Sequence, residues 1–175
     1  GWRTHVVCLA RKGAPAPLEE LPFSLDLSEA RKRCATSIAP DRYYRTLRGL
    51  GLEYGPSFRG IETLLCGEGD VLARVVMPDE LGEPSSVLHP ALLDACLHTY
   101  AALAEPRPDF DAAEDLPRGC YLPIDFERFD GRKAGAREVW VHSVRRTGPE
   151  GADKRGTSDI MIHASDGRPI AQIRG

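Results

Sequence analysis

LHPALLDACLH, which spans residues 88–98, is the stretch on which the fold of this chain depends. It belongs to His89–Leu103, the one long and mostly apolar segment that predicts a helix, and Pro90 stands in the first turn, where its missing N–H costs nothing. Asp94 and His98 are four residues apart, so both lie on one face of this helix. A carboxyl in such apolar surroundings must reach water, find a partner or keep a proton.

The pair formed by Asp94 and His98 has two interpretations. Pairs with this spacing are common on the solvent side of helices, and the spacing alone favours that ordinary role. A carboxyl that keeps its proton in an apolar setting can instead act as a general acid near neutral pH. His89, at the start of the helix, is expected to cap or pack rather than to act as a base. Three other histidines lie in strand-like segments without an acidic or cysteine partner at a useful spacing, and no role is assigned to them: His5, His142 and His163.

Strand-like segments, rich in β-branched or alternating residues, surround this helix and are separated by glycine-containing turns. The predicted strands are Ile61–Cys66, Asp70–Met77, Glu138–Thr147, Ser158–His163 and Pro169–Arg174. A shorter helix is predicted at Asp41–Gly49, because its aromatic and leucine residues recur at helical spacing. About five to seven strands and one long helix imply an α+β domain in which an antiparallel sheet wraps around a central helix.

The composition is that of one folded soluble domain of 175 residues, with 42% hydrophobic and 28% charged residues. Lysine and arginine number 23 against 26 acidic residues, without a basic stripe, so nucleic acid is not an expected partner. No apolar stretch approaches the roughly 20 residues of a membrane span, and no signal-peptide pattern opens the sequence. The five cysteines never form a C-x-x-C pair, which favours reduced thiols in a cytoplasmic protein and disfavours zinc.

Three motifs in a fixed order make the chain resemble the dehydratase domain of type I polyketide synthases. HPALLDACLH, residues 89–98, resembles the family's H-P-A-L-L-D-x-x-x-Q/H element, and YGPSFRG, residues 54–60, is similar to its Y-G-P-x-F-x-G element. Leu122-Pro123 looks like the L-P pair on the strand after the catalytic helix. The resemblance covers the chain from about residue 39 onward, and it implies a hotdog fold that forms the second half of a double hotdog.

The resemblance also implies roles for single residues. Asp94 would be the acid that protonates the departing β-hydroxyl, and His98 would hold that aspartate or the leaving hydroxyl by a hydrogen bond. Tyr54 would lie near the acyl pocket, where its hydroxyl either joins the polar network or simply packs. Gly55 and Pro56 would fix a backbone turn before the strand. The residues expected to line the tunnel for the acyl chain are Pro56, Phe58, Leu122 and Pro123.

The base that such a reaction needs has no counterpart in the sequence. In the family it is a histidine in an H-x-x-x-G-x-x-x-x-P element on the first hotdog half, and none of the five histidines has that spacing. Trp2-Arg3-Thr4-His5 instead resembles the W-x-x-H sequence on the last strand of that first half. Residues 1–11 are therefore expected to be that last strand, residues 12–40 a linker, and residues 41–175 the C-terminal hotdog. We expect such a fragment to be inactive alone.

The reaction implied by the resemblance is the removal of water from a β-hydroxyacyl thioester on an acyl carrier protein, which gives an α,β-enoyl thioester. No cofactor or metal is expected, because the phosphopantetheine arm arrives with the substrate. The implied partners are the N-terminal hotdog half, the acyl carrier protein and other synthase domains, which can be dimeric. Three alternatives stay open: a related product-template or pyran-forming cyclase domain, a non-catalytic hotdog docking module, and a stand-alone hotdog thioesterase or hydratase, which the W-x-x-H strand disfavours.

Overall fold

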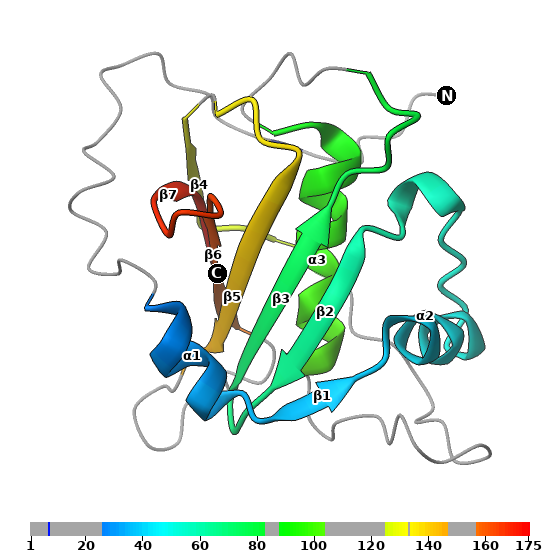
Figure 1. The fold of residues 1–175 in the computed structure, drawn as a ribbon, viewed down its shortest axis with the longest axis horizontal. Helices are drawn as coiled ribbons and strands as arrows, with labels where there is room; N and C mark the ends of the chain where they lie inside the picture. The colour runs from blue at the N-terminus through cyan, green and yellow to red at the C-terminus, as the bar shows by residue number, and fades with distance from the viewer. Residues whose placement is uncertain (1–6, 8–25, 83–87, 104–124, 133, 147–156) are drawn as a thin grey trace.

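The structure is a computed structural model that describes residue 7 and residues 26–82, 88–103, 125–132, 134–146 and 157–175 (Figure 1). Its strands form one antiparallel sheet of seven in the order β1-β2-β3-β5-β6-β7-β4. The strands are β1 (Thr36–Ile38), β2 (Ile61–Cys66), β3 (Asp70–Val76), β4 (Arg128–Gly131), β5 (Glu138–Arg145), β6 (Ser158–His163) and β7 (Pro169–Arg174). The helices are α1 (Leu27–Arg33), α2 (Pro40–Gly49) and α3 (Pro90–Leu103), with a short 3-10 turn, η2 (Pro56–Phe58).

The central helix is α3, which packs on strands β3 and β5 in the middle of the sheet (Figure 1). Its N-terminus is capped as expected, since the Ala91 N–H donates to Nδ1 of His89 over 3.2 Å. In a strand, alternate side chains point to opposite faces, and one set here meets the helix. The buried residues of this shared core include Val71, Ala73 and Val75 of β3, Val139 and Val141 of β5, and Ile160 and Ile162 of β6. The predicted wrapping of an antiparallel sheet around the long helix is confirmed.

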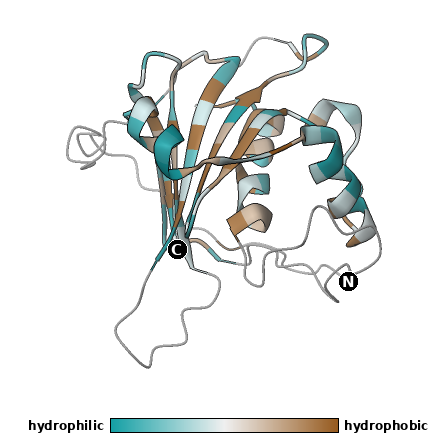
Figure 2. Cartoon of the chain, turned by 60° about the horizontal axis from the view of Figure 1, so that its bottom comes forward, coloured by the Kyte–Doolittle hydropathy of each residue, from teal (hydrophilic) through white to brown (hydrophobic). Residues whose placement is uncertain are grey.

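The opposite face of the sheet is covered in part by α1. Ala30 and Cys34 pack there against Leu72 of β3 and Trp140 of β5, which form a second small core. β3 is apolar at most of its positions and has buried residues on both faces, whereas β5 and β6 mix apolar and polar residues along their length (Figure 2). At this point the sheet therefore lies between two helices, α1 on one face and α3 on the other.

Two elements lie within the segment 12–40, which the sequence suggested to be a linker. α1 begins after Asp26, whose carboxylate accepts from the N–H groups of Ser28 and Glu29, and β1 pairs with β2 at the edge of the sheet. The sheet therefore begins before residue 41. The overlooked signal was the N-cap aspartate followed by an acidic first turn and a basic last turn.

The remaining predicted elements agree closely with the structure. The strands β2, β6 and β7 have the predicted bounds, while β3 ends one residue early at Val76 and β5 ends at Arg145. β4, which pairs with β7 at the other edge of the sheet, was not predicted. Of residues 1–11, predicted to be the last strand of the first hotdog half, residues 1–6 and 8–11 lie outside the described residues.

Two further findings concern membrane-spanning helices and the state of the cysteines. Among the described residues, no helix is long and apolar enough to cross a membrane. The cysteines described there are buried and free of disulfides, as predicted for reduced thiols: Cys34, Cys66 and Cys96.

Candidate functional site

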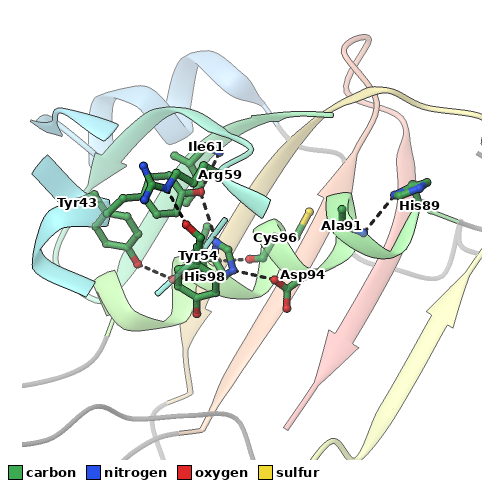
Figure 3. Close-up of polar contacts among 11 residues, drawn as sticks. Tyr43, Tyr54, Arg59, Ile61, His89, Ala91, Asp94, Cys96 and His98 are labelled. Atoms are coloured by element: carbon green, nitrogen blue, oxygen red, sulfur yellow. Dashed lines mark hydrogen bonds and ion pairs between the residues drawn. The ribbon is translucent and has the colours of Figure 1, made fainter. Parts of the chain in front are cut away.

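The Asp94 carboxyl and the His98 imidazole meet on one face of α3 (Figure 3). Nε2 of His98 lies 3.0 Å from Oδ2 of Asp94. The two side chains differ sharply in exposure: that of Asp94 is 43% exposed, whereas that of His98 is only 3% exposed. Asp94 therefore both reaches solvent and has a partner, and because the imidazole is buried the pair is not an ordinary surface pair.

His98 is buried because three tyrosines from the preceding segments surround it. The Tyr54 ring lies 3.9 Å from the imidazole, centroid to centroid, at an angle of 43°. The Tyr44 ring approaches edge-on at 5.9 Å, and its hydroxyl lies 3.4 Å from Nδ1. The hydroxyl of Tyr43 donates to the backbone carbonyl of His98 over 2.5 Å. Both ring nitrogens of His98 thus face a polar group, although the ring itself is in an aromatic setting.

The segment that carries Tyr54 is held against α2 by several contacts. Arg59 Nε donates to the carbonyl of Tyr54 over 2.8 Å, and its guanidinium lies over the Tyr44 ring at 5.9 Å. The backbone N–H of Ile61 donates to the Tyr44 hydroxyl over 3.2 Å. The 54–61 segment and α2 are therefore fixed to one another, and both contact His98.

Gly60 allows this segment to approach α3 closely. A Cβ atom at this position would lie 2.9 Å from the carbonyl oxygen of Val76 and 3.1 Å from Cβ of Ala95 on α3. The space needed by any side chain is thus occupied by backbone and by the central helix. The glycine that ends the YGPSFRG motif brings η2 against the helix that carries Asp94.

Burial determines the protonation of the groups behind the carboxyl. It lowers the pKa of His98 below the ordinary 6.5, although the nearby Asp94 carboxylate acts in the opposite direction. Burial also raises the pKa of the Tyr44 hydroxyl well above its ordinary value of 10. A neutral imidazole backed by a protonated phenol therefore stands behind the half-exposed carboxyl.

The structure brings together some of the predicted site residues and places others apart. Tyr54 lies against His98, while Gly55 and Pro56 are exposed at the start of η2 and Phe58 is 43% exposed. Leu122 and Pro123 lie outside the described residues. Sequence reasoning missed Tyr43 and Tyr44 as site residues, because their spacing was interpreted only as a helical apolar face.

A histidine without an expected role also has a partner. Nε2 of His142 lies 3.2 Å from Oδ2 of Asp70, which also accepts from Nε of Arg33 over 3.2 Å. Burial lowers the pKa of His142, while Asp70 raises it. This cluster lies on the face of the sheet that α1 covers, so it is separate from the Asp94 site. No acidic residue lies at a useful spacing from His142 in the sequence, and its partner in the fold comes from the neighbouring strand, β3.

Comparison with known proteins gives this site a context. A family model described as "Polyketide synthase dehydratase N-terminal domain" matches residues 22–175. The chain belongs to the polyketide synthase dehydratase family. The family description refers to the N-terminal domain of the dehydratase, whereas the motifs of this dehydratase chain resemble those of the C-terminal half. The family model and the motifs both indicate a dehydratase, but they indicate different halves of its double hotdog.

Relatives of this dehydratase chain are large polyketide synthases. The chain is 38% identical over 142 residues to the spectinabilin polyketide synthase system protein NorA′ of Streptomyces orinoci, covering 79% of the chain and 3% of that protein. It is 28% identical over 162 residues to the polyketide synthase PksN of Bacillus subtilis, covering 91% of the chain and 3% of that protein. The chain thus spans a small part of the length of these relatives.

Solved structures agree with this family and identify the fold. The dehydratase domain from the CurK module of curacin polyketide synthase matches with a TM-score of 0.70 and 25% identity, covering 86% of this dehydratase chain and 50% of that domain. The domain from the CurJ module matches with a TM-score of 0.65 and 23% identity, covering 94% of this chain and 53% of that one. The fold is the α+β hotdog, as predicted.

Proposed function

We propose that this chain supplies the acid of a dehydratase that removes water from a β-hydroxyacyl thioester on an acyl carrier protein. The observation that carries the proposal is a half-exposed carboxyl, Asp94, held at 3.0 Å by a buried imidazole, His98, on the central helix. Exposure lets the carboxyl meet a substrate, and the buried partner fixes its direction. The family supports a dehydration chemistry.

Loss of water from a β-hydroxyacyl thioester needs two proton transfers. A base removes the proton from the α-carbon, and the electron pair of that C–H bond forms the α,β double bond. The C–O bond at the β-carbon breaks, and its oxygen leaves as water after taking the Asp94 proton. The carboxylate that remains on Asp94 is stabilised by a hydrogen bond from His98, because donors to charged oxygens form the stronger bonds.

We assign the chain to the C-terminal half of the dehydratase. The support is the aspartate on the central helix, the preceding YGPSFRG segment, and the absence of the H-x-x-x-G-x-x-x-x-P pattern from the sequence. In this assignment the histidine base comes from a partner hotdog half, and this chain by itself has no dehydratase activity. The substrate arrives on the phosphopantetheine of an acyl carrier protein, and no further cofactor takes part.

The remaining motif residues have substrate-binding roles in this proposal. Tyr54 packs on His98 and forms part of the polar network, while Gly55, Pro56 and Phe58 lie on the exposed side of η2, where an acyl chain can contact them. Leu122 and Pro123 are proposed to complete the lining. Inactive aspartate-to-asparagine and histidine-to-phenylalanine variants of the CurK dehydratase are consistent with an acid and a base of these types.

The decisive experiment uses a dehydratase that contains this chain, with a β-hydroxyacyl carrier protein as substrate and mass spectrometry of the product. The Asp94→Asn variant is expected to lose at least about 100-fold in rate, the usual contribution of a general acid. Loss of water at the full rate by that variant would overturn the proposal. A cyclised product from the unmodified protein would instead assign the pyran-forming reaction.

The same assay tests the assignment to one half. The 175-residue chain alone should give no enoyl product, because it lacks the base, and addition of the missing half should restore the reaction. Turnover by the isolated chain would contradict the assignment to the C-terminal half.

A further inference from the structure

We infer that Tyr44 is a positioning residue that holds His98 in the tautomer with its proton on Nε2, so that this N–H donates to Asp94. The catalytic consequence rests on the function proposed above, whereas the tautomer itself is a property of this chain. Tyr44 lies outside the three family motifs, and its sequence pattern indicates only a helical apolar face.

Three contacts form a chain of hydrogen bonds from the backbone to the carboxyl. The N–H of Ile61 can only donate, so the Tyr44 oxygen accepts from it over 3.2 Å. Nδ1 of His98 lies 3.4 Å from the same oxygen, and Nε2 lies 3.0 Å from Oδ2 of Asp94. A neutral imidazole carries one proton, so one of its nitrogens donates and the other accepts.

Only one of the two tautomers satisfies every group in this chain of contacts. With the proton on Nε2, Tyr44 donates its O–H to Nδ1 and His98 donates to Asp94. With the proton on Nδ1, Tyr44 would accept two N–H bonds, and its own proton would have no acceptor among the described residues. The lone pair of Nε2 would then also face Asp94, where only a proton on that carboxyl could satisfy it. Because Tyr44 and His98 are both buried, leaving such groups unsatisfied is costly.

The electrostatic setting keeps both partners in the protonation states that this arrangement needs. Burial raises the pKa of Tyr44, so the phenol keeps the proton that it donates. Burial lowers the pKa of His98, so the imidazole is neutral and has a choice of tautomers. The other groups beside the ring are Asp94 on α3, Tyr54 on the η2 segment, and the Tyr43 hydroxyl at the His98 carbonyl.

The tautomer matters because it determines what Asp94 can do with a proton. If Nε2 donates, the carboxyl can release its proton to a substrate oxygen, and the resulting carboxylate is stabilised. If Nε2 is an acceptor, the carboxyl donates its own proton in a hydrogen bond to the imidazole. That proton is then less readily given to a substrate oxygen. Tyr44 therefore favours proton release through His98, since its hydroxyl lies at Nδ1 and the carboxyl lies at Nε2.

The first test measures the tautomer by ¹⁵N NMR of the histidine side chains in the 175-residue chain, with His98→Gln to assign the signals. The unmodified chain should show His98 protonated on Nε2, and Tyr44→Phe should shift it toward a mixture of tautomers. Tyr43→Phe is the matched control, since it also removes one buried phenol hydroxyl but one that contacts the carbonyl of His98. A proton on Nδ1 in the unmodified chain, or an unchanged signal in Tyr44→Phe, would overturn the inference.

The second test separates positioning from structure by kinetics in a dehydratase that contains this chain. Tyr44→Phe should lower kcat about fivefold with KM unchanged, as expected for the loss of one hydrogen bond. In a His98→Gln background the same substitution should have no further effect on kcat, because an amide has no tautomers. Equal losses in both backgrounds would show that Tyr44 acts through folding alone. If Asp94→Asn retains full activity, the proposed function fails, yet the NMR measurement still decides the role of Tyr44.

Discussion

Asp94 is half exposed while the imidazole that holds it is buried, and these two exposures set what each side chain can do. The carboxyl is open to a substrate, but one of its oxygens has a fixed position because His98 cannot move freely among three tyrosines. A donor of fixed geometry is more effective than a mobile one, because no further ordering is needed when charge develops. At the scale of single residues, the site is the Asp94 carboxyl with one preorganised hydrogen bond to His98.

The role of His98 predicts different results for two substitutions. In a dehydratase that contains this chain, His98→Gln should retain kcat to within about tenfold, because a side-chain amide also donates to Asp94. His98→Leu fills similar space without a donor, and its kcat should fall by about 100-fold. Circular dichroism and urea unfolding of both variants would check that they fold. Equal rates for the two variants would show that the hydrogen bond to Asp94 is not used.

At the scale of elements, the site depends on how closely α2 and η2 approach α3. The contacts come from Tyr43 and Tyr44 on α2 and from Gly60 after η2, and these meet the face of α3 that carries His98. The backbone N–H of Val76 also donates to the Gly60 carbonyl over 2.8 Å, which ties the segment to β3. The position of the Asp94 side chain relative to the YGPSFRG segment is thus set by backbone packing.

Gly60→Ala should destabilise the fold, since the added methyl group meets the Val76 carbonyl at 2.9 Å and Cβ of Ala95 at 3.1 Å. The expected loss in the free energy of unfolding is about 1–3 kcal/mol, the usual cost of overpacking. The matched control is Gly55→Ala in the same motif, where an added Cβ would meet nothing within 4 Å. Urea unfolding of both variants measures the difference. An unchanged midpoint for Gly60→Ala would contradict the close approach.

Some of the helices and strands could be predicted from the sequence, and others could not. The bounds of β2, β6 and β7 followed from β-branched or alternating residues, and the extent of α3 followed from a long apolar run with a proline in its first turn; both signals depend only on neighbouring residues. β4 was missed because its four residues, Arg128–Gly131, are too few to show a strand period and include a glycine. α1 was missed because its first residues follow a proline-containing stretch that was interpreted as a linker.

For the whole molecule, two buried histidines stand in separate polar clusters, one with Asp94 on α3 and one with Asp70 on the face covered by α1. Burial lowers the pKa of both below 6.5 in the folded state. The unfolded chain binds protons at these residues near pH 6.5, while the folded chain does not until lower pH. The free energy of unfolding therefore decreases as the pH falls below about 6.5.

The measurement is urea unfolding of the 175-residue chain between pH 7.5 and pH 5.5, values chosen on either side of the usual histidine pKa of about 6.5. Each histidine should contribute a slope of at most about 1.4 kcal/mol per pH unit. The variants His98→Gln and His142→Gln should each have a shallower slope. Stability that rises toward pH 5.5 would show that the carboxylates of Asp94 and Asp70 raise the pKa values of the two histidines more than burial lowers them.

The sequence pattern alone predicted an antiparallel sheet around one long helix and placed Asp94 and His98 on one face of it, while the family resemblance added the hotdog fold and a site role for Tyr54. Local pattern carries this information, because the helical spacing of Asp94 and His98 and the period of the strands need only nearby residues. Tertiary structure decided which member of the Asp94–His98 pair is buried. It also decided that Tyr44 stands behind His98, a residue 54 positions later in the chain, and that His142 meets Asp70. Burial and hydrogen-bond partners depend on segments that only the folded chain brings together, so no local period contains them.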